Sequence, residues 1–140
     1  MEKQKIIAVA VILLFVGVIA YFFIQSETAK DQVPSYVTGE KRVIYEWAKT
    51  AEGAGLLEQI PCYCGCKYEG HKHARHCFWR DDGTFDKHGV TCSVCLDIAI
   101  KARQMHEQSQ SVCEIRQEID QFYEPNQHLG TDTPLPDGCY

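Results

Sequence analysis

Eight cysteines constrain what this 140-residue chain can fold into, because six of them lie between positions 62 and 95. Cys62, Cys64 and Cys66 alternate with single residues in the stretch PCYCGC. Two thiols separated by one residue do not readily close a disulfide, since that bond needs a particular Cα separation and Cβ direction. In an extended segment the three side chains point to one face. The pattern therefore predicts three thiols presented together, either to distant cysteines or to a metal ion.

A second group, Cys92 and Cys95, has the CxxC spacing at the start of a predicted helix over 92–107, with Thr91 as its N-cap. A helix N-terminus favours negative charge, so both thiols should ionise more readily than a free thiol. Ionised thiols suit metal ligation and also thiol–disulfide exchange. The predicted buried face of this helix comprises Cys95, Ile98, Ala99, Ala102 and Met105.

Three interpretations of these cysteines remain open: a disulfide scaffold, a thiolate–imidazole metal site, and thiol–disulfide exchange through Cys92 and Cys95. Crowding favours the metal site, because three neighbouring thiols are awkward to pair with three remote partners. The segment before Cys92 also lacks the βαβ pattern of a thioredoxin-like domain. Thiolates with imidazoles select copper(I), zinc or an iron–sulfur cluster. The predicted metal ligands are Cys62, Cys64, Cys66, His71, Cys77, His88, Cys92 and Cys95.

The remaining cysteines, Cys113 and Cys139, lie apart from this group. Cys113 is one position off the buried stripe of a predicted helix, and Cys139 lies near the end of a tail without periodicity. A bond between them would attach the tail to the helix. We therefore predict a Cys113–Cys139 disulfide.

The N-terminal segment 6–24, IIAVAVILLFVGVIAYFFI, carries no charge, and a helix of that length spans roughly the hydrocarbon core of a bilayer. It exceeds the apolar region of a cleaved signal peptide, which favours an uncleaved transmembrane anchor. Lys3 and Lys5 precede it, so the positive-inside tendency places residues 1–5 in the cytoplasm. Residues 25–38 are then a polar linker, and 39–140 an extracytoplasmic cysteine-rich domain. There, unpaired thiols tend to oxidise, so the cysteines need disulfide partners or a metal.

The fold class that we predict is mainly α: about three helices and irregular metal-binding loops form a small domain after the transmembrane helix. A helix over 40–51 should end at Gly53 and Gly55. Ser111 and Glu114 form a capping box for the last helix. Segment 67–90 is rich in turns and predicts at most a short hairpin. The predicted apolar stripes are Val43, Ile44, Trp47, Ala48 and Ala51 in the first helix and Val112, Ile115, Ile119 and Phe122 in the last.

Charge and motif content exclude two classes of function. The net charge of −5 comes without a basic stripe, so nothing supports nucleic-acid binding. The chain shows no Ser/His/Asp arrangement, paired acid–base motif or phosphate-binding glycine loop. We therefore expect no enzyme, apart from the redox alternative through the CxxC cysteines.

These motifs resemble the PCYCGC-motif family of bacterial and archaeal cell-surface proteins and lipoproteins. The resemblance rests on PCYCGC at 61–66, GH at 70–71, CF at 77–78, DKHGVTCSVCLDIA at 86–99 and EIRQEIDQFY at 114–123. It implies a surface location and this cysteine set, with a transmembrane anchor where members often carry a lipid-modified cysteine. Cys113 and Cys139 lie outside the family motif. GVTCSVCLDIAIKA after an earlier CxC is also similar to the [2Fe–2S] domains of bacterioferritin-associated ferredoxins, which implies an iron–sulfur alternative.

These observations together predict a membrane-anchored extracytoplasmic protein that binds a soft metal ion in metal handling. Copper(I), in a chaperone or sequestration role near the cell surface, is the first candidate, and structural zinc is the second. The implied partners are the membrane and a protein that donates or accepts the metal. The alternatives are a disulfide-stapled structural or interaction domain, and a redox or [2Fe–2S] protein that uses the CxC and CxxC cysteines.

Overall fold

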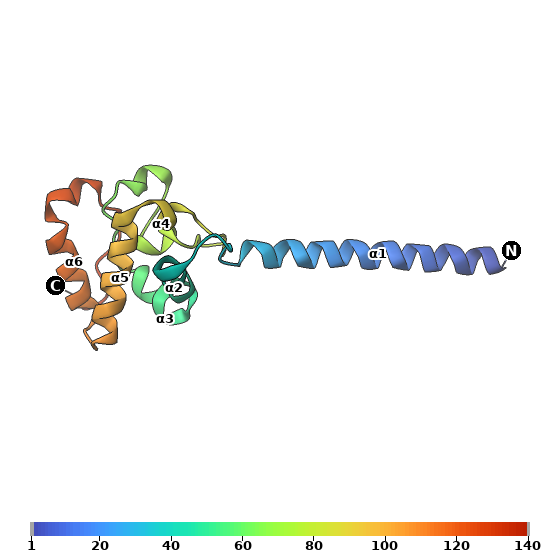
Figure 1. Ribbon diagram of the computed structural model, residues 1–140, viewed down its shortest axis with the longest axis horizontal. Helices are drawn as coiled ribbons and strands as arrows, with labels where there is room; N and C mark the ends of the chain where they lie inside the picture. The colour runs from blue at the N-terminus through green and yellow to red at the C-terminus, as the bar shows by residue number, and fades with distance from the viewer. Residues whose placement is uncertain (1, 140) are drawn as a thin grey trace. The chain divides into compact units, whose positions relative to one another are not determined.

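The computed structural model describes residues 2–139 and divides the chain into two compact units between Gln32 and Val33. The first unit is the helix α1, Glu2–Lys30, drawn in blue in Figure 1. Among the described residues, no helix combines the length and the apolar character that crossing a membrane requires. The predicted anchor at 6–24 lies within α1, and several of its side chains lie outside what the structure describes. The anchor therefore stays a prediction.

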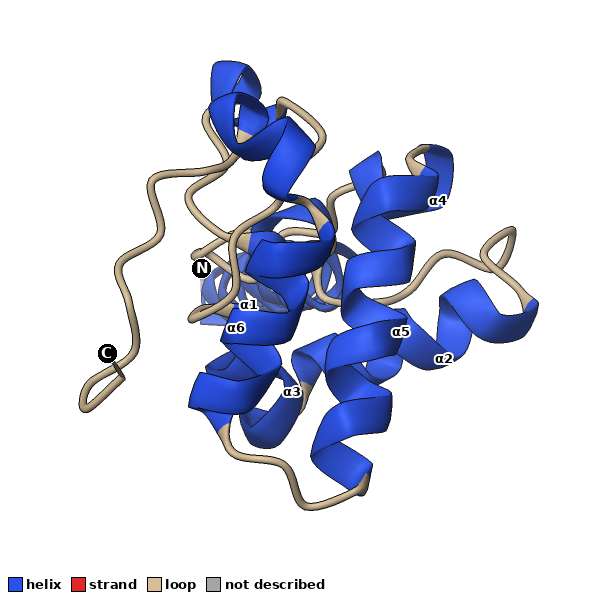
Figure 2. Ribbon diagram, turned by 90° about the vertical axis from the view of Figure 1, so that its left-hand side faces the viewer, coloured by secondary structure: helices blue, strands red, loops and turns tan. Residues whose placement is uncertain are grey.

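The second unit is a helical domain, which confirms the predicted fold class in its coarse form. Figure 2 shows it as helices joined by loops, and an isolated antiparallel bridge between Trp79 and Phe85 is the trace of the predicted hairpin. It has more helices than the three we predicted. They are α2 (Gly39–Lys49), α3 (Ala51–Leu57), α4 (His88–Thr91), α5 (Ser93–Glu107) and α6 (Val112–Phe122), with 3-10 turns η1 (Cys66–Glu69), η2 (Ala74–Cys77) and η3 (Glu124–Leu129).

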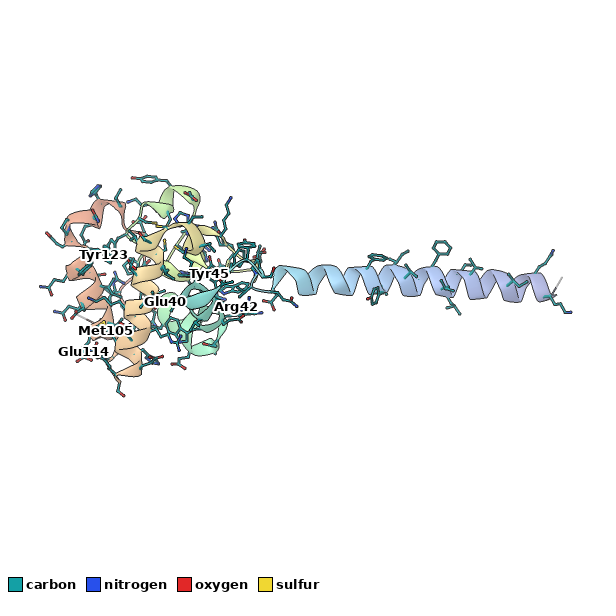
Figure 3. All side chains as sticks on the ribbon, viewed as in Figure 1. Glu40, Arg42, Tyr45, Met105, Glu114 and Tyr123 are labelled. Carbon is teal, nitrogen blue, oxygen red and sulfur yellow. A yellow bond between two sulfur atoms is a disulfide. The ribbon has the colours of Figure 1, made fainter. Side chains whose placement is uncertain are left out.

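The domain is organised around α5, which contacts α2, α3, α4 and α6. Its buried face agrees with the prediction at every position. Cys92 is its N-cap residue, one position later than predicted, because Thr91 ends the short helix α4. The buried residues of α5 are Cys95, Ile98, Ala99, Ala102 and Met105, the last labelled in Figure 3.

The first predicted helix is in fact two helices, and the prediction that Gly53 and Gly55 end it is wrong. α2 stops at Lys49, and α3 then runs through both glycines. Thr50 starts the new helix, because its hydroxyl accepts the Gly53 N–H at 3.0 Å. A local N-cap and close packing on α2 thus override the low helix propensity of glycine.

The apolar stripe of α2 also differs from the prediction. Val43 and Ala51 are exposed, whereas Tyr45 is buried. Tyr45 packs on Phe85 and Phe78, with ring centroids 4.9 and 5.0 Å apart, and its hydroxyl donates to the Asp86 carbonyl at 2.6 Å. These contacts attach α2 to the loops that carry the cysteines.

The two glycines of α3 give opposite expectations. A Cβ at position 53 would lie 2.2 Å from the Trp47 carbonyl oxygen, a backbone atom that cannot rotate away. Gly53→Ala should therefore lower the free energy of unfolding by about 1–3 kcal/mol, as overpacking does. Gly55 has no atom within 4 Å of such a Cβ, so Gly55→Ala should raise stability by about 0.5–1 kcal/mol through helix propensity. Urea unfolding of both variants tests this; equal effects would contradict it.

α6 begins with the predicted capping box: Ser111 Oγ accepts the Glu114 N–H, and the Glu114 carboxylate accepts the Ser111 N–H at 2.7 Å. Ile115 and Ile119 are buried as predicted, but Phe122 is 65% exposed. The helix instead buries Arg116. Cys113 and Cys139 form the predicted disulfide and attach the tail to this helix.

Candidate metal centre

The PCYCGC segment is held by its backbone rather than by regular structure. The Cys62 N–H donates to Thr131 Oγ1 at 2.9 Å, and the Cys62 carbonyl accepts the Thr131 N–H at 3.0 Å. Gly65 adopts a left-handed conformation with φ of +84°, which turns the chain into η1 at Cys66. These bonds fix the three alternating cysteines opposite the start of α5.

Six cysteines are free in the structure, and their sulfur atoms form one connected cluster. Cys62 Sγ lies 3.3 Å from Cys95 Sγ, 3.4 Å from Cys64 Sγ and 3.6 Å from Cys77 Sγ. Cys66 Sγ lies 3.9 Å from Cys77 Sγ. Two thiolates on one tetrahedral zinc ion lie about 3.8 Å apart, whereas disulfide sulfurs lie about 2 Å apart. The separations therefore fit shared metal ligation.

Two histidines join the cluster, and both are residues that the sequence singled out. His88 Nε2 lies 3.4 Å from Cys64 Sγ, and His71 Nδ1 lies 3.4 Å from Cys77 Sγ. Two histidines outside the cluster pair with acids: His76 Nε2 lies 2.5 Å from Asp81, and His106 Nε2 lies 2.8 Å from Glu52.

Each cluster histidine has a carboxylate at its other ring nitrogen. Glu69 Oε2 lies 3.3 Å from His88 Nδ1, and Asp86 Oδ2 lies 3.5 Å from the buried His71 Nε2, which makes no hydrogen bond. A carboxylate that accepts a hydrogen bond from this nitrogen fixes the tautomer and orientation of a metal-binding imidazole. Glu69 is placed for this role at His88, whereas Asp86 Oδ2 accepts from Arg80 Nε at 2.6 Å and lies near His71 without a hydrogen bond. Sequence reasoning missed Glu69, because its contact arises only where η1 folds back towards α4.

All eight predicted ligands fall into groups whose donor atoms lie within 4.8 Å of one another and could hold a metal ion. The structure therefore brings together every residue of the predicted set. The main groups are Cys64, His88, Cys92 and Cys95; Cys62, Cys64 and Cys66; Cys62, Cys77 and Cys95; Cys66, His71 and Cys77; and Glu69, His71 and His88.

Burial and mutual hydrogen bonding shift the acidities of these groups in opposite directions. Burial lowers the pKa of His71, but hydrogen bonds to Cys66 and Cys77 outweigh it and raise the pKa to about 9. The hydrogen bond with Cys62 lowers the pKa of Cys66 and raises that of Cys95. Thiols must lose their protons to bind a metal ion, so metal binding to this cluster would release protons.

A surface pocket of about 490 Å³ adjoins the cluster. Its lining includes Glu69, Asp86 and His88, the residues on the outer side of the imidazoles. Cys64, Cys92 and His88 are partly exposed, whereas Cys62, Cys66, Cys77 and Cys95 are buried. The centre therefore has one side that is closed by protein and one side that faces solvent.

A family model described as a protein of unknown function with PCYCGC motif matches residues 22–136. The matched range includes all eight cluster residues and Cys113, but not Cys139. Comparison with the curated proteins and with solved structures gives no match.

Proposed function

The chain belongs to the PCYCGC-motif family, and we propose that it is a soft-metal-binding protein whose centre is the cluster of six cysteines and two histidines. The observation that carries this proposal is the spacing of the sulfur atoms, 3.3 to 3.9 Å between neighbours. Thiols buried at that spacing without disulfides repel one another once ionised, and a cation removes the repulsion. The carboxylates beside His71 and His88 support the same role.

The donor set favours zinc, with copper(I) as the second candidate. Three thiolates with one imidazole form a known structural zinc site, and imidazole suits zinc well. Copper(I) accepts fewer ligands and is selected by thiolates, six of which are available here. Both ions protect thiols from oxidation, so both fit a domain outside the cytoplasm.

We extend the proposal to the location of the protein. Segment 6–24 anchors it in the membrane, residues 1–5 remain in the cytoplasm, and the domain lies outside. Large apolar side chains exposed along α1 support an anchor, among them Leu13, Leu14 and Phe15. In that place the protein handles metal near the cell surface, and it receives the ion from, or passes it to, a partner protein. We propose binding rather than catalysis.

The alternatives have weaker support. A disulfide scaffold fits poorly with six free cysteines, and thiol exchange through Cys92 and Cys95 lacks the sheet of thioredoxin-like proteins among the residues that the structure describes. An iron–sulfur cluster needs four cysteine ligands. The CxC and CxxC motifs together contain four cysteines, so the number of cysteines is what supports this alternative.

One assay separates these functions. The full chain, purified in detergent without oxygen, should contain zinc or copper, with six titratable thiols after denaturation in chelator and two cysteines in a disulfide. A Cys113→Ser, Cys139→Ser double variant should keep its metal, because both residues lie outside the cluster. A protein with every cysteine oxidised and no metal would overturn the proposal. Visible absorption with about two irons per chain would select the iron–sulfur alternative instead.

A further inference from the structure

The eight donor residues can be divided into two sets of four, each with three cysteines and one histidine. The outer set is Cys64, His88, Cys92 and Cys95, whose donor atoms all lie within 4.8 Å of one another. The inner set is the remaining four residues, Cys62, Cys66, His71 and Cys77, and Cys62 also groups with members of the outer set. In the inner set Cys66, His71 and Cys77 meet the same limit, and Cys62 Sγ completes it at 3.6 Å from Cys77 Sγ.

Coordination number and charge both favour more than one ion. A tetrahedral zinc ion takes four of these donors, and four would remain beside it. If metal binding ionised all six free cysteines, they would carry six negative charges, of which one divalent cation balances two. The sets also touch: Cys62 Sγ lies 3.3 Å from Cys95 Sγ and 3.4 Å from Cys64 Sγ. Cys62 is thus placed to bridge two ions.

The inner and outer sets also differ in how far solvent can reach them. Each histidine has a different carboxylate near its other ring nitrogen, Glu69 at 3.3 Å from His88 and Asp86 at 3.5 Å from His71. Every member of the inner set is buried, with His71 at 4% exposure the most accessible. In the outer set only Cys95 is buried, and the pocket of about 490 Å³ is lined by His88 and Glu69.

We propose that the domain binds two soft divalent ions, of the zinc class, in a binuclear centre: a structural ion in the inner set and an exchangeable ion in the outer set. This inference rests on the proposed metal-binding function. Because every residue of the inner set is buried, a competing ligand could reach the inner ion only by disturbing the core. The outer ion can accept a ligand through the pocket beside His88, and so it is the ion that the protein gives or receives.

The test measures zinc content and zinc release on the full chain in detergent, reduced and loaded without oxygen. The wild type should hold two zinc ions and release them to a chromophoric chelator in two phases of equal amplitude. Cys92→Ser should hold one ion and lose the fast phase only. Glu69→Gln, which removes no ligand, should weaken the fast-phase ion by about 10–100-fold and leave the slow phase unchanged. His106→Gln is the matched control. It breaks a histidine–carboxylate pair outside the cluster, so this variant should bind and release zinc as the wild type does.

Cobalt substitution supplies a second readout that does not depend on the release kinetics. The wild type should take up two Co²⁺ with tetrahedral thiolate spectra, and Cys92→Ser one. A single zinc per chain, a single release phase, or loss of both ions in Glu69→Gln would overturn the binuclear inference alone. A protein that binds no zinc and no cobalt would overturn the metal-binding function with it.

Discussion

Chelation of the bound metal should unfold the domain outright, which is the largest effect that we expect. Cys62, Cys66, Cys77 and Cys95 belong to the hydrophobic core and are at most 1% exposed. Apparent binding free energies of structural zinc are about 10–16 kcal/mol, whereas a whole domain is stable by about 5–15 kcal/mol. Removing the ions leaves crowded thiols at the centre of the core and removes a free energy as large as the whole stability of a typical domain. Near-UV circular dichroism and the thermal transition should both disappear and return when zinc is added.

A reductant provides the control for this experiment. It opens the Cys113–Cys139 disulfide, which attaches only the tail, and should leave a cooperative thermal transition in the metal-loaded protein. A disulfide scaffold predicts the reverse pattern, with chelator harmless and reductant destructive. An unchanged thermal transition after complete removal of the metal would show that the core does not depend on the ions.

Arg116→Ala should destabilise the domain by about 1–3 kcal/mol, because it removes the buried guanidinium from its hydrogen-bond acceptors, although its partner Asp120 is 25% exposed. The Arg116 side chain is 10% exposed, and its Nε donates to both carboxylate oxygens of Asp120 at 2.8 and 2.9 Å. The guanidinium also donates to the carbonyl oxygens of Gln59, Thr133 and Pro134. It therefore joins α6 to the tail and to the segment that leads into PCYCGC, and alanine leaves these three carbonyl oxygens without that donor.

Arg103→Ala is the matched control. Arg103 also pairs with an acid four residues later, Glu107 at 2.7 Å, but these side chains are 30% and 55% exposed. Exposed helix pairs contribute about 0.3–0.5 kcal/mol, so this variant should unfold at nearly the wild-type urea concentration. Urea unfolding of both variants with metal bound compares the two arginines, and equal midpoints would refute the role assigned to Arg116.

The helices that the sequence predicted best are those with strong local determinants. The face of α5 repeats at helical spacing, and the Ser111–Glu114 capping box defines the start of α6 without any tertiary contact. The break between α2 and α3 was missed, because Thr50 caps a helix whose glycines argue against helix on propensity alone. Phe122 was wrongly placed in the core: the stripe of α6 shifts as Arg116 turns inward to bind Asp120.

The candidate centre was predictable in its ligands but not in its arrangement. Cysteine spacing and the nearby histidines were enough to select His71 and His88, both of which contact cluster sulfurs. The roles of Glu69 and Asp86 were not predictable, since each contact joins segments that only the fold brings together. Asp86 illustrates this point, because it follows no metal motif and yet faces His71 across the loop.

The sequence by itself determined the helical class and the candidate cysteine set, because helical periodicity and residue chemistry are local properties. Tertiary structure alone decided which sulfurs are neighbours and which are buried, and it confirmed the Cys113–Cys139 disulfide, whose partners are 26 residues apart. Those properties depend on where α5 begins relative to the PCYCGC segment, and that position is set by Thr131, Tyr45 and Arg116 from distant parts of the chain. Long-range packing therefore determines which of these donor atoms lie together and which of them solvent can reach.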